Sequence, residues 1–239
     1  MLASVATFAI EGVDSREVAV EADLRRGLPV FTIVGLPDAA VREARERVRA
    51  ALLNSGLEFP LQRLTANLAP ADVRKAGPSF DLALAAAVLA ASGQVPREAL
   101  GSYALCGELS LGGALRPIRG ALAMAFGARA AGFERLIVPV ENGGEAALVG
   151  GLEVLGVPDL ARMVAVLRGE WRPDPPVPPA PFVAPAAADD LGDVRGQTDA
   201  KRALELAAAG GHNLLVVALE SQNRSTERNP NRIGPLTTA

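Results

Sequence analysis

The stretch that decides the fold runs over residues 67–91 and reads NLAPADVRKAGPSFDLALAAAVLAA. Its second half is a nearly uninterrupted aliphatic run rich in Ala and Leu, which favours a helix that is buried on all sides. We therefore predict a buried helix over residues 79–92, ended by Gly93. Residues 64–68 just before it are predicted to form a strand, so the stretch encodes a strand, a loop and a helix in that order.

Regular patterns extend outward from this stretch in both directions. Apolar and charged residues alternate over residues 17–24, which predicts a half-buried strand. Asp38 is expected to cap a helix over residues 38–55, closed by Gly56. Further strands are predicted over 5–10, 30–34, 103–106, 136–140 and 153–155, and further helices over 119–131, 145–149 and 159–167. Opening strands followed by mixed helices and strands predict a layered α/β (α+β) domain.

Composition limits the function classes. Hydrophobic residues make up 49% of the 239 residues and aromatic residues only 4%, so the core must be aliphatic. A net charge of −3 argues against general coating of nucleic acid but leaves room for a local basic patch. Cys106 is the single cysteine, so no internal disulfide forms and nothing indicates an oxidising compartment. The longest apolar run, 82–91, is far below the roughly 18 residues of a membrane helix, and we expect a cytoplasmic protein without a membrane partner.

Four zones follow one another along the chain. Residues 1–169 alternate strand-like and helix-like segments and are predicted to form one domain. Residues 170–190 contain seven prolines and are predicted to be an extended, semi-rigid linker. Residues 191–217 resume a pattern of a helix, 198–209, and then a strand, 213–217. The polar residues 218–239 show no periodicity and are expected to be a disordered tail.

Several motifs occur in one unbroken order over about residues 1–217. They are GLP at 27–29, FTIVGLP at 31–37, NLAPAD at 67–72, KAGPSFDL at 75–82, GELSLGGALR at 107–116, LIVP at 136–139, and the segment from Gly196-Gln197 to GHNLL at 211–215. Together they resemble the ComM/YifB family of magnesium-chelatase-like ATPases.

This resemblance implies an architecture and a cellular role. The first domain is expected to be Lon-protease-like, with the fold of ribosomal protein S5 domain 2, followed by a linker and the start of an AAA+ ATPase core. The full-length family implies ATP and Mg as cofactors, a hexamer, and action on branched DNA during natural transformation. We therefore expect a noncatalytic module for DNA binding or hexamer assembly, with branched or single-stranded DNA and a homo-oligomer as partners.

Ser79 occupies the position of the serine nucleophile of Lon-type proteases, in the turn Gly77-Pro78-Ser79. Such a serine needs a nearby base to take its proton, and in that family the base is a lysine. The resemblance places Leu122 where that lysine is expected, so we expect no catalytic residues here. Ser79 is then expected to cap the helix that follows, with Asp81 favoured by the helix dipole. A Lon-class serine protease with another base is the alternative.

A nucleotide site is expected to be incomplete. Val194, Gly196 and Gln197 resemble the residues that approach adenine in an AAA+ core. The phosphate loop G-x-x-x-x-G-K-[ST] should follow Val217, but no Gly-Lys pair occurs in the chain. We therefore expect no ATP or Mg binding by this chain, which would be cut off before its phosphate loop. A non-functional product of a frameshift or premature stop is a further alternative.

A possible DNA-binding stripe lies on the helix predicted over 38–55. Arg42, Arg45 and Arg49 share one face at helical spacing and are candidates for phosphate contacts. The alternative is a solvated face with Arg42–Glu46 and Glu43–Arg47 pairs, or a subunit contact that uses the same stripe. His212 is the only histidine, so we expect no metal site.

Overall fold

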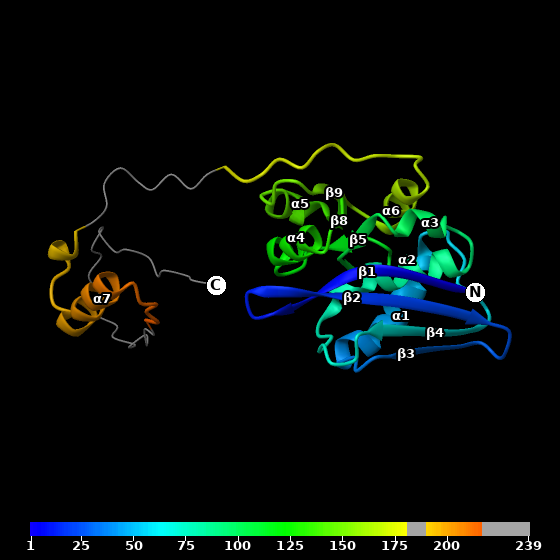
Figure 1. The fold of residues 1–239 in the computed structure, drawn as a ribbon, viewed down its shortest axis with the longest axis horizontal. Helices are drawn as coiled ribbons and strands as arrows, with labels where there is room; N and C mark the ends of the chain where they lie inside the picture. The colour runs from blue at the N-terminus through cyan, green and yellow to red at the C-terminus, as the bar shows by residue number, and fades with distance from the viewer. Residues whose placement is uncertain (181–189, 217–239) are drawn as a thin grey trace, which may run out of the picture. The chain divides into compact units, whose positions relative to one another are not determined.

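The computed structural model describes residues 1–180 and 190–216 (Figure 1). The chain divides into two units, Met1–Pro181 and Phe182–Ala239. Among the described residues, no helix combines the length and the apolar character needed to cross a membrane.

A seven-stranded sheet forms the centre of the first unit, in the order β3-β4-β2-β1-β5-β8-β9. Its strands are β1 (Leu2–Glu11), β2 (Asp14–Arg25), β3 (Val30–Val34), β4 (Arg63–Ala69), β5 (Tyr103–Leu105), β8 (Arg135–Pro139) and β9 (Glu153–Val157). The pairs β1–β2 and β2–β4 are antiparallel, and the other neighbours are parallel. A separate hairpin joins β6 (Glu108–Leu109) to β7 (Leu115–Arg116).

Helices cover both faces of this sheet and complete the layered α/β fold that the sequence predicts. They are α1 (Ala39–Asn54), α2 (Asp81–Ala91), α3 (Arg97–Leu100), α4 (Ala121–Ala130), α5 (Val140–Ala146) and α6 (Leu160–Leu167). Strand β8 shows the two layers because its side chains alternate. Ile137 packs in the cluster with α1, α2 and α6, whereas Leu136 and Val138 pack in the cluster with α4 and α5.

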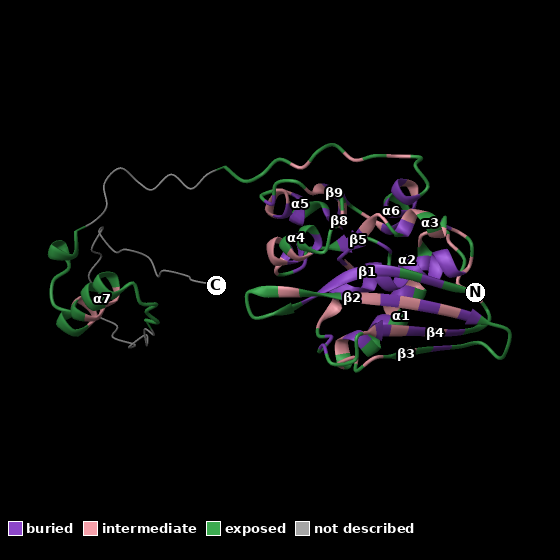
Figure 2. Ribbon diagram, in the orientation of Figure 1, coloured by how far each residue is buried: buried purple, intermediate pink, exposed green. Residues whose placement is uncertain are grey.

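Helix α2 lies at the centre of the unit, and all of its residues are buried (Figure 2). The aliphatic run therefore forms the buried helix that the sequence predicts. Helix α1 packs beside it and begins at the expected cap, because the Asp38 carboxylate accepts a hydrogen bond from the Val41 N–H at 2.8 Å. Gly35 precedes this cap with φ +100°, and a Cβ there would lie 2.2 Å from the Leu68 carbonyl oxygen, so only glycine fits.

One predicted helix lies elsewhere. Instead of residues 145–149, the helix is α5, which begins directly after Pro139 ends β8. The pair Gly143-Gly144 made this segment an unlikely helix by propensity. Tertiary packing explains the pair, since a Cβ on Gly144 would lie 2.7 Å from the Val177 carbonyl oxygen, so the proline-rich segment runs directly over α5.

The described part of the proline-rich segment, residues 171–180, forms no helix or strand, as its prolines predict. In the second unit, a short 3-10 helix η2 (Leu191–Asp193) precedes α7 (Thr198–Gly210), which confirms the predicted helix over 198–209. The strand predicted over 213–217 is wrong for residues 213–216, which are irregular, and Val217 lies outside the described residues. No residue in 190–216 is buried, so this strand has no sheet neighbour to stabilise it. The tail 218–239 also lies outside the described residues.

Candidate functional site: a serine cleft and an arginine groove

Ser79 lies in a short 3-10 helix, η1 (Pro78–Phe80), that leads into α2. Three hydrogen bonds hold this turn. Gly77 N–H donates to the Asp38 carboxylate at 3.2 Å, Gly107 N–H donates to the Ser79 carbonyl at 2.9 Å, and Leu82 N–H donates to the Gly107 carbonyl at 3.1 Å. The expected cap is wrong, because the residue that precedes α2 is Phe80 and no side chain caps either helix. The reason is the proline, which tightens the turn and moves the start of α2 two residues beyond Ser79.

The Ser79 side chain instead borders a cleft of about 480 Å³. Gly77 and Pro78 form one wall, and the segment from Pro117 to Gly120 before α4 lies across from it. Arg74, Arg119 and Glu108 add charged groups. Sequence reasoning missed Glu108, which comes from the unpredicted hairpin β6–β7 and pairs with Arg116 at 3.6 Å.

The structure does not bring the expected kind of base to Ser79. Leu122 is a partly buried residue of α4 that packs with the α4–α5 cluster and does not border the cleft. Its N–H donates to the Glu145 carboxylate at 3.1 Å, so it serves the start of its helix. Lys75 is fully buried, and its ammonium donates to the Pro70 carbonyl. Burial lowers the pKa of Lys75, but the described residues show no contact between its amine and Ser79.

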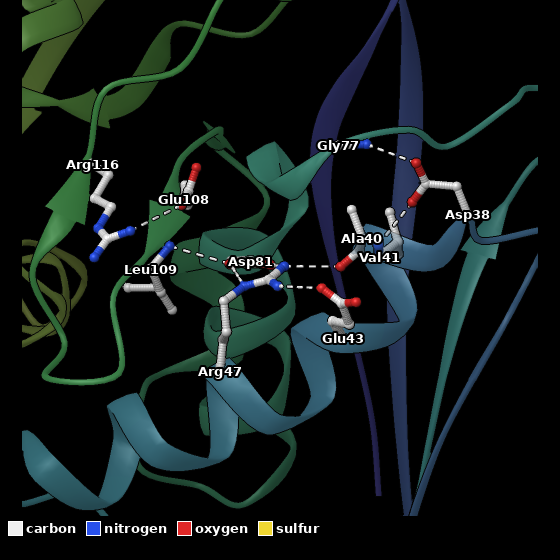
Figure 3. Close-up of polar contacts among 10 residues, drawn as sticks. All are labelled: Asp38, Ala40, Val41, Glu43, Arg47, Gly77, Asp81, Glu108, Leu109 and Arg116. Carbon is white, nitrogen blue, oxygen red and sulfur yellow. Dashed lines mark hydrogen bonds and ion pairs between the residues drawn. The ribbon is translucent and has the colours of Figure 1, made fainter.

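Asp81 is bound by a partner that sequence spacing did not reveal. The Arg47 guanidinium of α1 donates to both Asp81 carboxylate oxygens, at 2.7 and 3.0 Å, and to the Ala40 carbonyl at 2.9 Å (Figure 3). Asp81 also accepts the Leu109 N–H at 3.2 Å. Burial raises the pKa of Asp81 and the hydrogen bonds from Arg47 oppose that shift, while the same bonds raise the pKa of Arg47. Asp81 thus joins α1, α2 and β6, which goes beyond the expected interaction with the helix dipole.

The arginines of the α1 stripe have different surroundings. Arg45 and Arg49 are exposed and line a groove of about 180 Å³ with Phe31 and Phe59. Arg49 lies over the Phe59 ring, 5.7 Å from its centre. Arg42 is exposed but does not border this groove, because its guanidinium donates to the Pro37 carbonyl at 2.9 Å.

The two helical ion pairs considered for this stripe differ in outcome. The Glu43–Arg47 pair forms at 3.7 Å, although Arg47 bonds chiefly to Asp81. The Arg42–Glu46 pair is not found among the described residues, since Glu46 accepts from Arg45 at 3.0 Å instead. Local spacing favours such pairs only weakly, and neighbouring backbone carbonyls compete for the guanidinium.

The end of the sheet beside the groove carries further arginines. Arg63 of β4 pairs in register with Val30, which lines the groove, and lies directly opposite Arg25 of β2. Two like charges directly opposite each other on neighbouring strands repel. Arg25 is partly compensated by Asp23 at 2.5 Å, whereas no ion pair of Arg63 or Arg26 occurs among the described residues.

The residues that resemble a nucleotide site are open to solvent. Val194, Gly196 and Gln197 are exposed and lie between η2 and α7. No residue in the described range 190–216 is buried. The described ranges also contain no group of three or more His, Cys, Asp or Glu residues arranged to hold a metal ion.

Comparison with known proteins places these features in a family. The model of the family "Subunit ChlI of Mg-chelatase" matches residues 20–142, and that of "Magnesium chelatase, subunit ChlI" matches residues 190–225. The chain belongs to the magnesium-chelatase ChlI family. Within this ChlI family, the chain is 44% identical to YifB of Escherichia coli over 216 residues, which cover 90% of the chain and 42% of YifB.

Two other relatives add detail. The chain is 40% identical to the competence protein ComM of Haemophilus influenzae over 222 residues, covering 90% of the chain and 43% of ComM. It is 32% identical to the Lon protease of Chloroflexus aurantiacus over 133 residues, which cover 52% of the chain and 16% of that protease. The chain thus spans about two-fifths of the length of YifB and ComM. Its ComM/YifB-like and Lon-like character agrees with the resemblance read from the motifs.

Proposed function

We propose that this chain is a noncatalytic binding module of a ComM/YifB-type, DNA-processing AAA+ protein in the cytoplasm, and that it contacts DNA through Arg45 and Arg49. The observation that carries the proposal is the contrast among the arginines of α1. Arg47 is held by a buried carboxylate, whereas Arg45 and Arg49 face solvent along a groove with an aromatic wall. Among the described residues, the one carboxylate in that groove, Glu46, is exposed and pairs with Arg45 at 3.0 Å, so Arg49 leaves the groove with a net positive charge. Guanidinium groups beside an aromatic ring suit a nucleic-acid strand, because they bind phosphates and assist base stacking.

The neighbouring arginines support the same proposal. Arg25, Arg26 and Arg63 line one pocket at the adjoining end of the sheet together with Glu21 and Asp23, so arginines outnumber carboxylates there although the net charge of the chain is −3. A bound phosphate would relieve the repulsion between Arg25 and Arg63. The substrate class we propose is single-stranded or branched DNA, since unpaired bases are available for contact with Phe59.

A fluorescence anisotropy titration tests this proposal. Labelled single-stranded, four-way-junction and duplex oligonucleotides are titrated with the chain at low salt. We expect the single strand and the junction to bind more tightly than the duplex. Arg45→Ala/Arg49→Ala should weaken that binding by about tenfold or more, since each guanidinium is a charge-assisted donor. The matched control is Arg129→Ala, an exposed arginine of α4 outside the groove, which should bind like the unchanged chain.

Assembly is a second candidate for the same region, and a specific observation favours it. The neighbouring cleft of about 650 Å³ is lined by Met1, Leu53, Leu57, Phe59 and Leu61, and Leu61 is 75% exposed. Exposed apolar side chains of this kind are typical of contacts between subunits. Sedimentation velocity of the chain and of Leu61→Asp distinguishes the candidates: self-association that this substitution abolishes, without DNA binding, would favour assembly.

We propose that the chain has no protease or ATPase activity by itself. The positions of Leu122 and Lys75 support the first part, because neither offers a base to Ser79. The exposure of Val194, Gly196 and Gln197 supports the second part, since ATP and Mg need an enclosed phosphate site. Labelling of Ser79 by a fluorophosphonate probe, lost in Ser79→Ala, would contradict the first part. ATP hydrolysis that a single substitution in the chain abolishes would contradict the second.

A further inference from the structure

The hydroxyl of Ser79 is unused by the fold. The residue is only 9% exposed and forms no side-chain hydrogen bond among the described residues. Its Oγ is nevertheless accessible, because no buried side-chain oxygen among the described residues lacks a hydrogen-bond partner. The hydroxyl therefore opens into the cleft that Ser79 borders. Because this hydroxyl is accessible from the cleft, a water molecule or a ligand in the cleft can bind it.

The charged groups of the same cleft indicate what kind of ligand fits. Arg74 and Arg119 both border the cleft and are exposed, and neither forms an ion pair with a described residue. Two guanidiniums and a hydroxyl are all hydrogen-bond donors, a set suited to a carboxylate. Glu108 supplies one acceptor in the same cleft, and its pairing with Arg116 at 3.6 Å leaves it accessible to an N–H donor.

The remaining lining of the cleft is apolar. It is formed by Ile10, Pro78, Pro117, Ile118 and Met124. A volume of about 480 Å³ lies in the range of pockets that enclose a small ligand or a few residues of a peptide. A ligand that fits this lining therefore combines an anionic end with an apolar side chain.

The walls of the cleft are held in place by bonds outside it. Buried Asn142 of α5 accepts the Ile118 N–H at 2.8 Å and donates to the Ile118 carbonyl at 2.9 Å. On the opposite wall, Gly107 holds the Ser79 backbone at 2.9 Å. Because both walls are fixed before a ligand arrives, little ordering cost opposes binding.

We propose that this cleft binds the C-terminal end of a polypeptide whose last residue is apolar, and that it does so without cleaving it. The terminal carboxylate is bound by Arg74, Arg119 and the Ser79 hydroxyl. The apolar side chain of the last residue packs against the apolar lining of the cleft, and Glu108 accepts a peptide N–H. A nucleic-acid strand fits less well, because Glu108 would repel a chain of phosphates and the apolar lining of the cleft offers the phosphates no hydrogen-bond donor. This peptide site is independent of the DNA contact proposed for Arg45 and Arg49.

The test uses the full chain and a fluorescein-labelled pentapeptide of alanine that ends in leucine. One probe carries a free C-terminal carboxylate and the other a C-terminal amide, and both are titrated by fluorescence anisotropy to about 1 mM chain. The free acid is expected to bind about tenfold more tightly than the amide. Arg74→Ala/Arg119→Ala should remove that preference, and Ser79→Ala should weaken binding of the acid about threefold to tenfold. Arg129→Ala, outside the cleft, should leave both affinities unchanged.

Three results would overturn the proposal: equal affinity for acid and amide, no binding of the acid over the whole titration, or a preference for the acid that survives Arg74→Ala/Arg119→Ala. Mass spectrometry of the probe after incubation should recover it intact, and cleavage that Ser79→Ala abolishes would also overturn it. The DNA titration keeps the two sites apart, because Arg74→Ala/Arg119→Ala should bind single-stranded DNA as the unchanged chain does. Both substituted arginines are exposed, so the variant is expected to fold normally.

Discussion

The two sides of helix α1 use the same residue type for different purposes. On the inner side, Arg47 binds Asp81 with both carboxylate oxygens occupied, and the side chain of Asp81 is fully buried. On the outer side, Arg45 and Arg49 both line the groove, and the Arg45 side chain is 51% exposed. Neither arginine bonds to a buried carboxylate of the described residues. The difference shows that a stripe of arginines is not one feature, because burial of the partner decides whether a guanidinium supports the fold or is free to bind.

This comparison separates stability from binding. A buried ion pair that loses one partner leaves an uncompensated charge, whereas an exposed arginine contributes little to folding. Substitutions on the inner side should therefore change the free energy of unfolding, and substitutions on the outer side should change affinity for DNA.

The largest effect is expected for Asp81→Ala. It leaves the Arg47 guanidinium and the Leu109 N–H without their acceptor, and should lower the free energy of unfolding by about 3–5 kcal/mol. Urea unfolding followed by circular dichroism measures this loss. The matched control is Glu43→Ala, which removes the exposed partner of Arg47 and should cost less than about 0.5 kcal/mol. An equal loss in the free energy of unfolding for Asp81→Ala and Glu43→Ala would contradict the distinction between the two sides of α1.

Two adjacent leucines on α1 show the same contrast between a buried and an exposed side chain, and neither is charged. Leu52 is fully buried, whereas Leu53 is 53% exposed. Leu52→Ala should destabilise the chain by about 2–5 kcal/mol, because it leaves a cavity in the core cluster that Leu52 shares with α2. Leu53→Ala should change the free energy of unfolding by less than about 0.5 kcal/mol. Urea titrations of the two variants side by side give the difference, and a cost for Leu53→Ala as large as that for Leu52→Ala would contradict the inner and outer assignment.

On the outer side, Arg49→Ala should weaken binding of single-stranded DNA about threefold to tenfold and leave the unfolding curve unchanged. Arg49→Lys keeps the charge but loses the planar group over Phe59, so its affinity should fall between those of the unchanged chain and Arg49→Ala. Anisotropy titrations at one salt concentration measure all three. An Arg49→Lys variant that binds as weakly as Arg49→Ala would show that charge is not what the groove supplies.

The smallest effect is expected for Arg42→Ala. Arg42 shares the stripe in sequence, but its guanidinium is bound to the Pro37 carbonyl and lies outside the groove. We expect less than about a twofold change in DNA affinity and less than about 0.5 kcal/mol in stability. The anisotropy titration and a urea curve measure these changes. A loss of affinity as large as that of Arg49→Ala would mean that the groove extends along the whole stripe.

Much of the fold could be predicted from local patterns. The Asp38 cap, the strands β2, β3 and β4, and the fully buried α2 all follow from periodicity and capping, which act over a few residues. The failures have tertiary causes. Helix α5 carries two glycines that local propensity disfavours but that packing against the proline-rich segment requires. Residues 214–216 are apolar, yet no described strand pairs with them.

The candidate site was predictable only in part. The turn around Ser79 and the exposed positions of Arg42, Arg45 and Arg49 follow from sequence, whereas the largely buried position of Arg47 does not. The Arg47–Asp81 pair joins residues 34 positions apart, and Glu108 reaches the cleft from a hairpin of two-residue strands. Local sequence spacing predicts neither the Arg47–Asp81 pair nor the position of Glu108, because both depend on how α1, α2 and the hairpin pack together.

The dependence of DNA affinity on salt tests the central claim most directly. The slope of log Kd for single-stranded DNA against log salt concentration is measured for the unchanged chain and for Arg45→Ala/Arg49→Ala. If both guanidiniums contact phosphates, the slope should fall by about 1.4, since each contact to a single strand contributes about 0.7. An unchanged slope, with both proteins equally sensitive to salt, would contradict the assignment of the outer side of α1 to DNA.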